Sequence, residues 1–356
     1  MALKLKNIRE KIDRGDFEIL SLLKKRLELA LMTKKLKKEV VDPERETEIL
    51  ERLTKKAKAL GLLDPDFVEK VFALHISESK KMQGKTYSLA GFQGEYGAYS
   101  EIATLKFNPS LVPIALDDFS DVFENVSSDY LDLGVVPVEN SIGGAVPQAN
   151  ELLVDTKLRV VGEIKLPVKH CLLVLPNTDY KDLKTVYSHP QALSQCRNFL
   201  QRNKLEGRPY YDTAGAAKML STQRPEASAV IASSRCAQLY DLEIIKEGIE
   251  DHPQNYTRFL VLSRTADKSK LNNKCSIIFS VQDRAGALFE VLEIFADAKI
   301  NLTRIESMPR RDAPGNYYFF LDFLANSSDK KVADILKTVE EACDKYNFLG
   351  CYKGDK

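Results

Sequence analysis

Polar side chains that could take part in catalysis or binding lie at the ends of several predicted strands. Thr257 and Arg258 directly precede an apolar run that reads as a buried strand. The other groups of this kind are Glu139 with Asn140 and Ser141, Ser188 with Gln195, and Thr213 with Ala214. Residues beyond the carboxyl ends of strands line the ligand crevice of open α/β sheets. We therefore expect these groups to line one cleft, although each group alone also fits a cap or turn.

A second set of candidates consists of cations in the N-terminal segment. Arg26 and Lys37 are 11 positions apart in the sequence, which places them on nearly the same face of a helix. Arg9 lies about 25 Å from Arg26 along a straight helix and faces another direction. The two arginines cannot share a small site on that helix, so a functional Arg9 must reach a second chain. Ser79 and Gln83 form a polar pair at helical spacing.

Helical periodicity runs through residues 5–83 and positions these cations. Asp42-Pro43 and Asp64-Pro65 each combine an N-cap with proline at the first helical position, so three helices are predicted. The first helix, of about 33 residues, is about 50 Å long and needs a partner to pack against. We expect an intertwined homodimer or a higher homo-oligomer.

The rest of the chain divides into two further regions. Short apolar runs alternate with helical stretches over residues 86–263, which is typical of an α/β domain. After a polar linker, residues 275–352 have the strand and helix order βαββαβ of a ferredoxin-like sandwich. The predicted domains are 1–84, 85–265 and 272–356.

Composition limits the class of protein. The 356 residues are 44% hydrophobic with a net charge of +1, and no apolar run is long enough to span a bilayer. The N-terminus lacks the apolar centre of a signal peptide, so we expect a cytoplasmic protein without a membrane partner. Basic residues are interleaved with acidic ones, which argues against a nucleic-acid partner. The 6 cysteines show no metal-ligand spacing and are expected to be free, buried thiols.

A glycine-rich stretch, GFQGEYGAYSE at residues 91–101, follows a predicted strand and opens a helix. Its spacing is G-x-x-G-x-x-G, which differs from the dinucleotide fingerprint. We favour a turn whose backbone N–H groups face a carboxylate, and we expect no cofactor and no metal.

The N-terminal segment resembles the all-helical chorismate mutase domain over nearly all of residues 5–83. The resemblance rests on IREKID, LLKKR and HISESKKMQ. It implies that cations clamp the two carboxylates of chorismate while Lys37 and Gln83 bond the ether oxygen. The remaining substrate-binding positions that it implies are Arg9, Arg26, Asp42, Arg45, Glu46 and Ser79. Such a unimolecular rearrangement requires restraint and preorganised donors but no base.

The central region resembles prephenate dehydratase through GEYGAYSE, VPVENSIGG, SHPQALSQC, DTAGAA and NYTRF, in that order. The family has two α/β lobes around a cleft, like periplasmic binding proteins, and converts prephenate to phenylpyruvate. The resemblance implies that Thr257 serves the departing hydroxyl and that Arg258 holds a substrate carboxylate or orients the loop. Supporting roles are implied for Glu139, Asn140, Ser141, Ser188, Gln195, Thr213, Ala214 and Phe259. His189 precedes Pro190 and is expected to be structural.

The C-terminal region resembles the ACT regulatory domain through AGALFEVLEIF and INLTRIESMP. The resemblance implies L-phenylalanine as effector, bound by Gly286, Ala287, Leu288, Asn301, Glu306 and Ser307. Met308 stands where the family usually has arginine, which removes a charge-assisted donor.

The sequence therefore predicts a bifunctional chorismate mutase and prephenate dehydratase of phenylalanine biosynthesis with feedback regulation by phenylalanine. Two alternatives stay open at this point. One is a dehydratase that accepts arogenate, the transaminated form of prephenate. The other is a non-catalytic, two-lobed receptor for amino acids or organic anions, because such lobes also occur in binding proteins.

Overall fold

The computed structural model describes residues 2–37, 39–326 and 329–355. The chain forms two compact units, residues 1–88 and residues 89–356, and each is described by itself.

The first unit is all-helical, as predicted. Its helices are α1 (Ala2–Lys34), α2 (Pro43–Leu60) and α3 (Pro65–Gln83). The two Asp-Pro pairs begin α2 and α3: Asp42 accepts a hydrogen bond from the N–H of Arg45, and Asp64 accepts one from the N–H of Asp66. Several apolar side chains of α1 are exposed within one chain, namely Leu5, Ile8, Ile12, Ile19, Leu20, Leu22 and Leu29.

The second unit contains a two-lobed α/β region. The sheet of its first lobe has the order β2-β1-β3-β11-β5, and β4 pairs with β3. These strands are β1 (Leu89–Gln93), β2 (Val112–Leu116), β3 (Leu133–Asn140), β4 (Gly144–Ala145), β5 (Arg159–Pro167) and β11 (Tyr256–Ser263). The helices of this lobe are α4 (Tyr99–Phe107), α5 (Phe119–Ser127) and α6 (Pro147–Val154). The buried side chains of β11, Phe259 and Val261, pack with Ala103 of α4 in the core.

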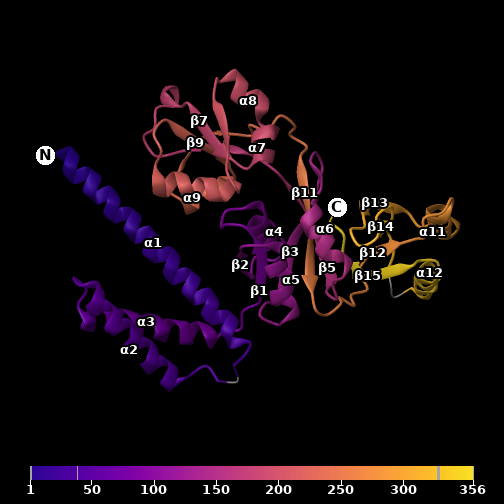
Figure 1. The fold of residues 1–356 in the computed structure, drawn as a ribbon, viewed down its shortest axis with the longest axis horizontal. Coiled ribbons are helices and arrows are strands. Elements are labelled where there is room, and N and C mark those ends of the chain that lie inside the picture. The colour runs from indigo at the N-terminus through magenta and orange to yellow at the C-terminus, as the bar shows by residue number, and fades with distance from the viewer. Residues whose placement is uncertain (1, 38, 327–328, 356) are drawn as a thin grey trace. The chain divides into compact units, whose positions relative to one another are not determined.

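The sheet of the second lobe has the order β10-β6-β9-β7-β8. Its strands are β6 (Cys171–Val174), β7 (Thr185–Ser188), β8 (Glu206–Pro209), β9 (Ser228–Ala232) and β10 (Glu243–Glu247). Its helices are α7 (Pro190–Gln195), α8 (Arg197–Arg202), α9 (Thr213–Gln223) and α10 (Ser234–Leu239), with a short 3-10 turn, η1 (Tyr180–Asp182). The chain enters this lobe after β5 and returns to the first lobe through β11 (Figure 1). Thr257 therefore lies at the start of β11, just after the chain passes back from the second lobe to the first.

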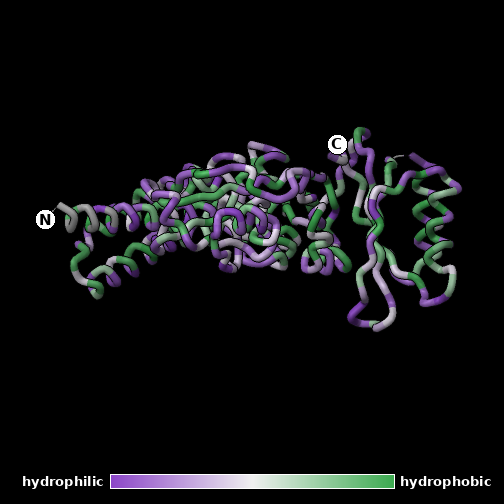
Figure 2. The backbone as a smooth tube through the Cα atoms, turned by 90° about the horizontal axis from the view of Figure 1, so that it is seen from above, coloured by the Kyte–Doolittle hydropathy of each residue, from purple (hydrophilic) through white to green (hydrophobic). Residues whose placement is uncertain are grey.

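The C-terminal domain is the predicted βαββαβ sandwich. Its sheet has the order β13-β14-β12-β15. The elements are β12 (Lys274–Ser280), α11 (Ala287–Asp297), β13 (Leu302–Pro309), β14 (Tyr317–Phe323), α12 (Lys330–Glu341) and β15 (Lys345–Tyr352). Both helices cover the face of this sheet that points away from the two lobes (Figures 1 and 2).

The opposite face of this sheet packs against the first lobe. The amide of Asn347 on β15 donates to the carbonyls of Val154 and Thr156, at 3.2 and 3.1 Å. A Cβ at Gly350 would lie 2.8 Å from the carbonyl oxygen of Val160 on β5. Glycine at this position therefore allows β15 to approach the edge strand β5.

One expectation about the cysteines is wrong. Cys275 and Cys351 face each other across β12 and β15 and form a disulfide. Their spacing of 76 residues resembles no framework pattern, so only the strand pairing brings them together. The other four cysteines are free, and Cys171, Cys196 and Cys236 are buried as expected. Within the described ranges, no helix has the length and apolar character needed to cross a membrane.

Candidate functional site

In the helical unit, one face of α3 carries a row of buried polar side chains. His75, Ser79 and Gln83 are four residues apart and face α1. Arg26 of α1 contacts two of them: its Nη1 lies 2.6 Å from Nδ1 of His75 and donates to Oγ of Ser79 at 3.2 Å. The sequence predicted Ser79 and Gln83 in this row but missed His75.

The contacts of His75 define its protonation. Nε2 lies 3.2 Å from the carbonyl oxygen of Leu23, which can only accept, so Nε2 carries the hydrogen. Arg26 can only donate, so Nδ1 is the acceptor. Burial and the nearby charge of Arg26 lower the pKa of His75, which agrees with a neutral ring. A neutral His75 thus orients the Arg26 guanidinium.

Several other predicted mutase residues form pairs at the ends of the helices. Nζ of Lys37 lies 3.1 Å from Oδ2 of Asp42. Glu46 pairs at 2.9 Å with Lys80, a cation on α3 that the sequence interpretation missed. Arg45 pairs with Glu48, and Gln83 donates to the carbonyl of Ala30 and, at 3.2 Å, to Thr33. Arg9 is exposed near the start of α1 and does not meet Arg26 within the chain, as its position predicted.

In the two-lobed region, Thr257 lies opposite Asn140 on neighbouring antiparallel strands. Nδ2 of Asn140 donates to Oγ1 of Thr257 at 3.0 Å. Oδ1 of Asn140 accepts from the N–H of Gly143 at 2.8 Å, which fixes the orientation of the amide. In the described part of the chain, this accepted bond is the only hydrogen bond of the Thr257 hydroxyl. The hydroxyl hydrogen is therefore available to a ligand.

Asn140 also links the two lobes. Nε2 of Gln195, from the second lobe, donates to Oδ1 of Asn140 at 3.3 Å. Oε1 of Gln195 lies 3.0 Å from Nε2 of His170, and Nδ1 of His170 lies 3.0 Å from the hydroxyl of Tyr99. Nδ2 of Asn140 also donates to Oδ1 of Asn255 at 2.9 Å. We call Tyr99, Asn140, His170, Gln195, Asn255 and Thr257 the cleft network.

The cleft network determines the state of His170. Since Gln195 uses its nitrogen on Asn140, its oxygen accepts and Nε2 of His170 carries the hydrogen. Burial lowers the pKa of His170, which keeps the ring neutral. Sequence reasoning missed Tyr99, His170 and Asn255. For Asn255, its position two residues before Thr257 was the one available signal.

The remaining predicted cleft residues differ in their surroundings. Oγ of Ser141 accepts from the N–H of Tyr256 at 3.0 Å, beside the cleft network. Ser188 is fully buried and donates to the carbonyl of Ile231 at 2.6 Å, which corrects its expected role in orienting substrate. Thr213 begins α9, while Ala214 and Phe259 are buried among core side chains. His189 is a helix cap, as expected, because its Nδ1 accepts from the N–H of Gln191.

The expected role of Arg258 as a carboxylate clamp also needs correction. Side chains alternate along a strand, so Arg258 faces away from Thr257, as does its cross-strand partner Glu139. Arg258 is only 3% exposed and pairs with Glu163 of β5 at 2.7 Å and with Asp322 of β14 at 2.6 Å. Nη1 of Arg258 lies 3.9 Å from Glu139. Arg258, Glu163 and Asp322 are therefore buried on the face of β11 that points away from Thr257.

The glycine-rich turn holds the lobes together. The N–H of Gly97 donates to Glu101 at 2.6 Å, and the N–H of Gly94 donates to the carbonyl of Leu116 at 3.0 Å. Glu95 accepts from Lys218 of the second lobe at 2.9 Å. The N–H of Gly97 therefore faces a carboxylate, as expected, and this carboxylate belongs to Glu101 of the chain itself. The N–H of Gly94 bonds a backbone carbonyl instead.

The predicted effector residues fall into two groups within one chain. Gly286, Ala287 and Leu288 lie at the start of α11, and Asn301 follows the end of this helix, about 15 Å away by helical rise. Glu306 pairs with Arg304 on β13, and Ser307 points to the other face of that strand. A single chain therefore does not bring all six residues to one point.

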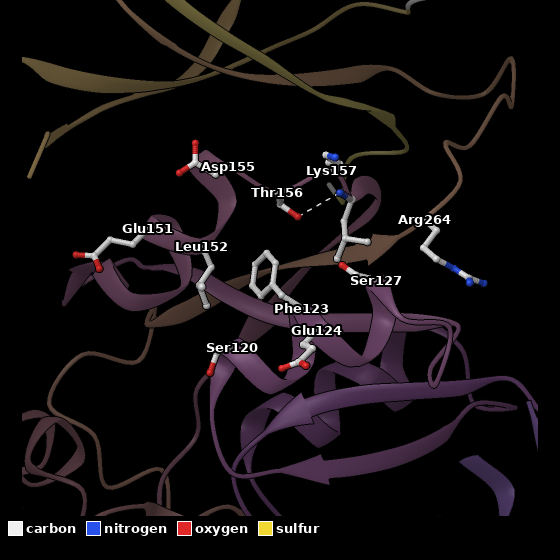
Figure 3. A pocket seen from close by; sticks show the side chains of 11 residues that line it. Ser120, Phe123, Glu124, Ser127, Glu151, Leu152, Asp155, Thr156, Lys157 and Arg264 are labelled. Carbon is white, nitrogen blue, oxygen red and sulfur yellow. Dashed lines mark hydrogen bonds between the residues drawn. The ribbon is translucent and has the colours of Figure 1, made fainter. Parts of the chain in front are cut away.

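A cavity of about 660 Å³ lies elsewhere, between α5 and α6 (Figure 3). None of the predicted site residues lines it. Its charged lining consists of the carboxylates Glu124, Glu151 and Asp155 and the cations Lys157 and Arg264. Glu151 is paired with Arg311 and Arg264 with Asp129, which leaves two carboxylates against Lys157. Such a balance disfavours an anionic substrate, so the cleft network is the better candidate.

Family models match all three regions of the chain. The model for prephenate dehydratase matches residues 90–267, and the model for chorismate mutase type II matches residues 8–84. The model for the ACT domain matches residues 276–341.

Individual relatives agree with these matches. The bifunctional chorismate mutase/prephenate dehydratase of Escherichia coli (strain K12) is 32% identical over 98% of this chain and 96% of its own length. Arogenate dehydratase/prephenate dehydratase 2, chloroplastic, of Arabidopsis thaliana is 39% identical over 74% of this chain and 72% of its own. The crystal structure of the Arthrobacter aurescens prephenate dehydratase in complex with L-Phe has a TM-score of 0.69 at 28% identity, over 74% of this chain and 89% of its own. The chain belongs to the bifunctional chorismate mutase/prephenate dehydratases with a C-terminal ACT domain, and it is an enzyme, both an isomerase and a lyase.

Proposed function

We propose that the helical unit rearranges chorismate to prephenate where Arg26 of α1 meets Ser79 and Gln83 of α3. Arg26, fixed by neutral His75, binds one carboxylate of the substrate. Lys37 and Gln83 donate to the ether oxygen as the breaking bond gives it negative charge. Arg9 from a second chain completes the clamp, since it lies too far along α1 to act within its own chain.

In the dehydratase step, the bond from the ring to its carboxylate breaks and carbon dioxide leaves. The electron pair of that bond enters the ring, which becomes aromatic as the ring hydroxyl departs from the opposite carbon. The departing oxygen takes up a proton and becomes water, so a donor must face it. Thr257 is the donor in this proposal, because its oxygen accepts from Asn140 and its own hydrogen stays available. This hydrogen-bond direction is the observation that carries the proposal.

We propose prephenate rather than arogenate as the main substrate. The helical unit yields prephenate in the same chain, whereas arogenate requires a separate transamination. The Escherichia coli relative, which covers nearly the whole chain, carries prephenate dehydratase in its name. The plant relatives named as arogenate dehydratases support arogenate as the second candidate.

L-phenylalanine is the proposed effector of the ACT domain. The support is the Arthrobacter aurescens relative, whose structure contains L-Phe. Because Gly286–Leu288 and Asn301 lie at opposite ends of α11, the site is completed by a second chain. In this proposal the enzyme is a cytoplasmic homodimer or higher homo-oligomer, and L-phenylalanine inhibits it by feedback.

The decisive experiment supplies purified protein with chorismate and no added cofactor, and follows prephenate and phenylpyruvate. Thr257→Ala is expected to stop phenylpyruvate formation while prephenate accumulates; Arg26→Ala is expected to do the reverse, so that added prephenate alone is converted. Thr257→Ser is the matched control and should retain most turnover. Dehydratase turnover that survives in Thr257→Ala would refute the role of the hydroxyl.

The same assays decide the substrate and the effector. Higher kcat/KM on arogenate than on prephenate would replace the proposed substrate by its competitor. L-phenylalanine is expected to reduce dehydratase turnover, and an unchanged rate at saturating effector would remove the regulatory part of the proposal.

A further inference from the structure

A buried group of charged and polar side chains joins the dehydratase sheet to the ACT sheet. We call it the charge cluster; its members are Glu163, Arg258, Lys274, Ser276, Asp322 and Tyr352. Glu163 and Arg258 belong to the dehydratase strands β5 and β11. The other members belong to β12, β14 and β15 of the ACT domain. The strand that carries Thr257 therefore has charged contacts with the regulatory domain.

Arg258 is the centre of the charge cluster. Nε donates to Oε2 of Glu163 at 2.7 Å within the dehydratase sheet. Nη2 lies 2.6 Å from Oδ2 of Asp322 and donates to the hydroxyl of Tyr352 at 3.1 Å, both in the ACT domain. One guanidinium thus bridges the two domains with its fork of donors.

One further contact crosses the same boundary, and two others hold the ACT members of the cluster together. Nζ of Lys274 donates to Oε2 of Glu163 at 2.6 Å. Ser276 donates to Oδ1 of Asp322 at 2.5 Å, and its oxygen lies 2.7 Å from the hydroxyl of Tyr352. The two cations and two carboxylates balance in charge, and all four side chains are less than 10% exposed.

Removal of one charge from such a group leaves its partner uncompensated in a medium of low dielectric. Asp322 is in direct contact with Arg258. Without the carboxylate of Asp322, the two cations Arg258 and Lys274 share one carboxylate of the cluster, that of Glu163. The repulsion between the two cations then acts on Arg258, which is adjacent to Thr257 in β11. Because β11 is hydrogen-bonded on both sides, to β3 and β5, a displacement of Arg258 is passed to the Thr257 backbone.

We propose that Asp322, a residue of the ACT domain, is a positioning residue of the dehydratase site, which acts through Arg258 on the placement of the Thr257 hydroxyl. This inference rests on the proposed role of Thr257. It explains why a strand of the regulatory sheet keeps a buried carboxylate beneath the catalytic strand. It also connects β14 to catalysis, and β14 pairs with the β13 strand of the predicted effector residues.

The test uses the full-length chain and compares Asp322→Asn with the unchanged protein. A misplacement of about 1 Å lowers turnover by up to about 100-fold, so we expect dehydratase kcat to fall by about tenfold to 100-fold. KM for prephenate is expected to change little, since Asp322 does not touch the substrate. Mutase activity, measured in the same sample, is expected to stay unchanged. Asp334→Asn, an exposed carboxylate on α12, is the matched control and should alter neither activity.

A charge-balanced double variant separates positioning from a general loss of structure. Lys274→Met together with Asp322→Asn leaves one cation, Arg258, against one carboxylate, Glu163. Positioning through charge balance predicts that the double variant regains much of the dehydratase kcat that Asp322→Asn loses. Two independent structural defects would instead add, and the double variant would be slower than either single variant.

Ser276→Ala provides a second route if Asp322→Asn does not fold. This variant removes the hydroxyl that holds Asp322 while the charges stay in place, and it is expected to lower dehydratase kcat in the same direction but less. Unchanged kcat in a folded Asp322→Asn or Ser276→Ala protein would overturn the inference, as would a double variant that shows no recovery. These outcomes leave the role of Thr257 intact, because that role is tested separately by Thr257→Ala.

Discussion

At the scale of single residues, the dehydratase site depends on which groups donate and which accept. Asn140 donates to Thr257 because its own oxygen is held by the N–H groups of Ile142 and Gly143. The hydroxyl of Thr257 then keeps its hydrogen available, which is what the proposed transfer to the departing oxygen requires. His170 contributes through Gln195, whose amide oxygen accepts from Nε2 of the imidazole. The hydroxyl of Tyr99 donates to the carbonyl of Lys169 at 2.7 Å and lies 3.0 Å from Nδ1 of His170.

The neutral state of His170 makes stability depend on pH. Burial holds its folded-state pKa below the ordinary value of 6.5. Below that pH the unfolded chain binds the proton more readily than the folded chain, so acid favours unfolding. The contribution of neutral His170 to the free energy of unfolding is fully present above about pH 6.5. It is lost as the pH falls through the folded-state pKa.

We therefore expect His170→Gln to make the loss of stability in acid shallower. The measurement is calorimetric unfolding of both proteins at about pH 8 and about pH 5.5. His252→Gln, at an exposed histidine of the same domain, is the control and should keep the original slope. An identical pH dependence in His170→Gln would show that His170 does not titrate as described.

At the scale of secondary structure, the turn between β1 and α4 fits only glycine at position 97. Gly97 has a φ of +93°, and a Cβ there would lie 2.6 Å from Sγ of Cys236 in the second lobe. Its N–H also donates to Glu101, which pairs with Arg235 of the second lobe at 2.7 Å. The turn therefore depends on close contact between the two lobes.

Gly97→Ala is expected to destabilise the dehydratase region by more than the backbone conformation alone explains. The left-handed conformation costs a non-glycine residue about 1–2 kcal/mol, and the contact with Cys236 adds to it. Gly144→Ala is the matched control, because Gly144 has a φ of +76° but no atom within 4 Å of the added Cβ. Urea unfolding measures both variants, and equal losses of stability would refute the steric argument.

At the scale of the whole molecule, the helical unit leaves a face of α1 without a partner inside one chain. Ile8, Ile12 and Ile19 are exposed on this face, and Ile12 and Ile19 are two helical turns apart. A second copy of α1 would cover these side chains. It would also bring its Arg9 close to Arg26, Ser79 and Gln83 of the first chain. The intertwined dimer thus stays a prediction, and the physical reason for it is the burial of these exposed isoleucines.

Ile12→Glu with Ile19→Glu places two carboxylates on this face and is expected to prevent the association of two helical units. Mutase activity should then be lost because Arg9 no longer reaches the site, while dehydratase activity stays. Sedimentation velocity measures the oligomeric state, and both activities are assayed in the same preparation. Leu62→Glu, at an exposed position outside α1, is the control. A variant that is active as a mutase in monomeric form would disprove the shared site.

The sequence by itself determined the architecture, because its signals are local. Periodicity and the Asp42-Pro43 and Asp64-Pro65 caps define the three helices within a few residues, and the order of strands and helices defines the C-terminal sandwich. Thr257, Asn140 and Gln195 were identified in the same way, since each stands in a short motif at the end of an element. The family followed from the order of those motifs along the chain.

Only the tertiary structure decided which of these residues face the cleft. Alternation in a strand separates Thr257 from Arg258, but the covering of the second face by the ACT sheet depends on contacts between residues far apart in the chain. Arg258 reaches Glu163 across 95 residues and Tyr352 across 94, and Cys275 reaches Cys351 across 76. A buried ion pair or disulfide has no local pattern, because the energy that places it comes from packing two sheets together. For that reason the same guanidinium that reads in the sequence as a substrate clamp is, in the folded chain, a link between domains.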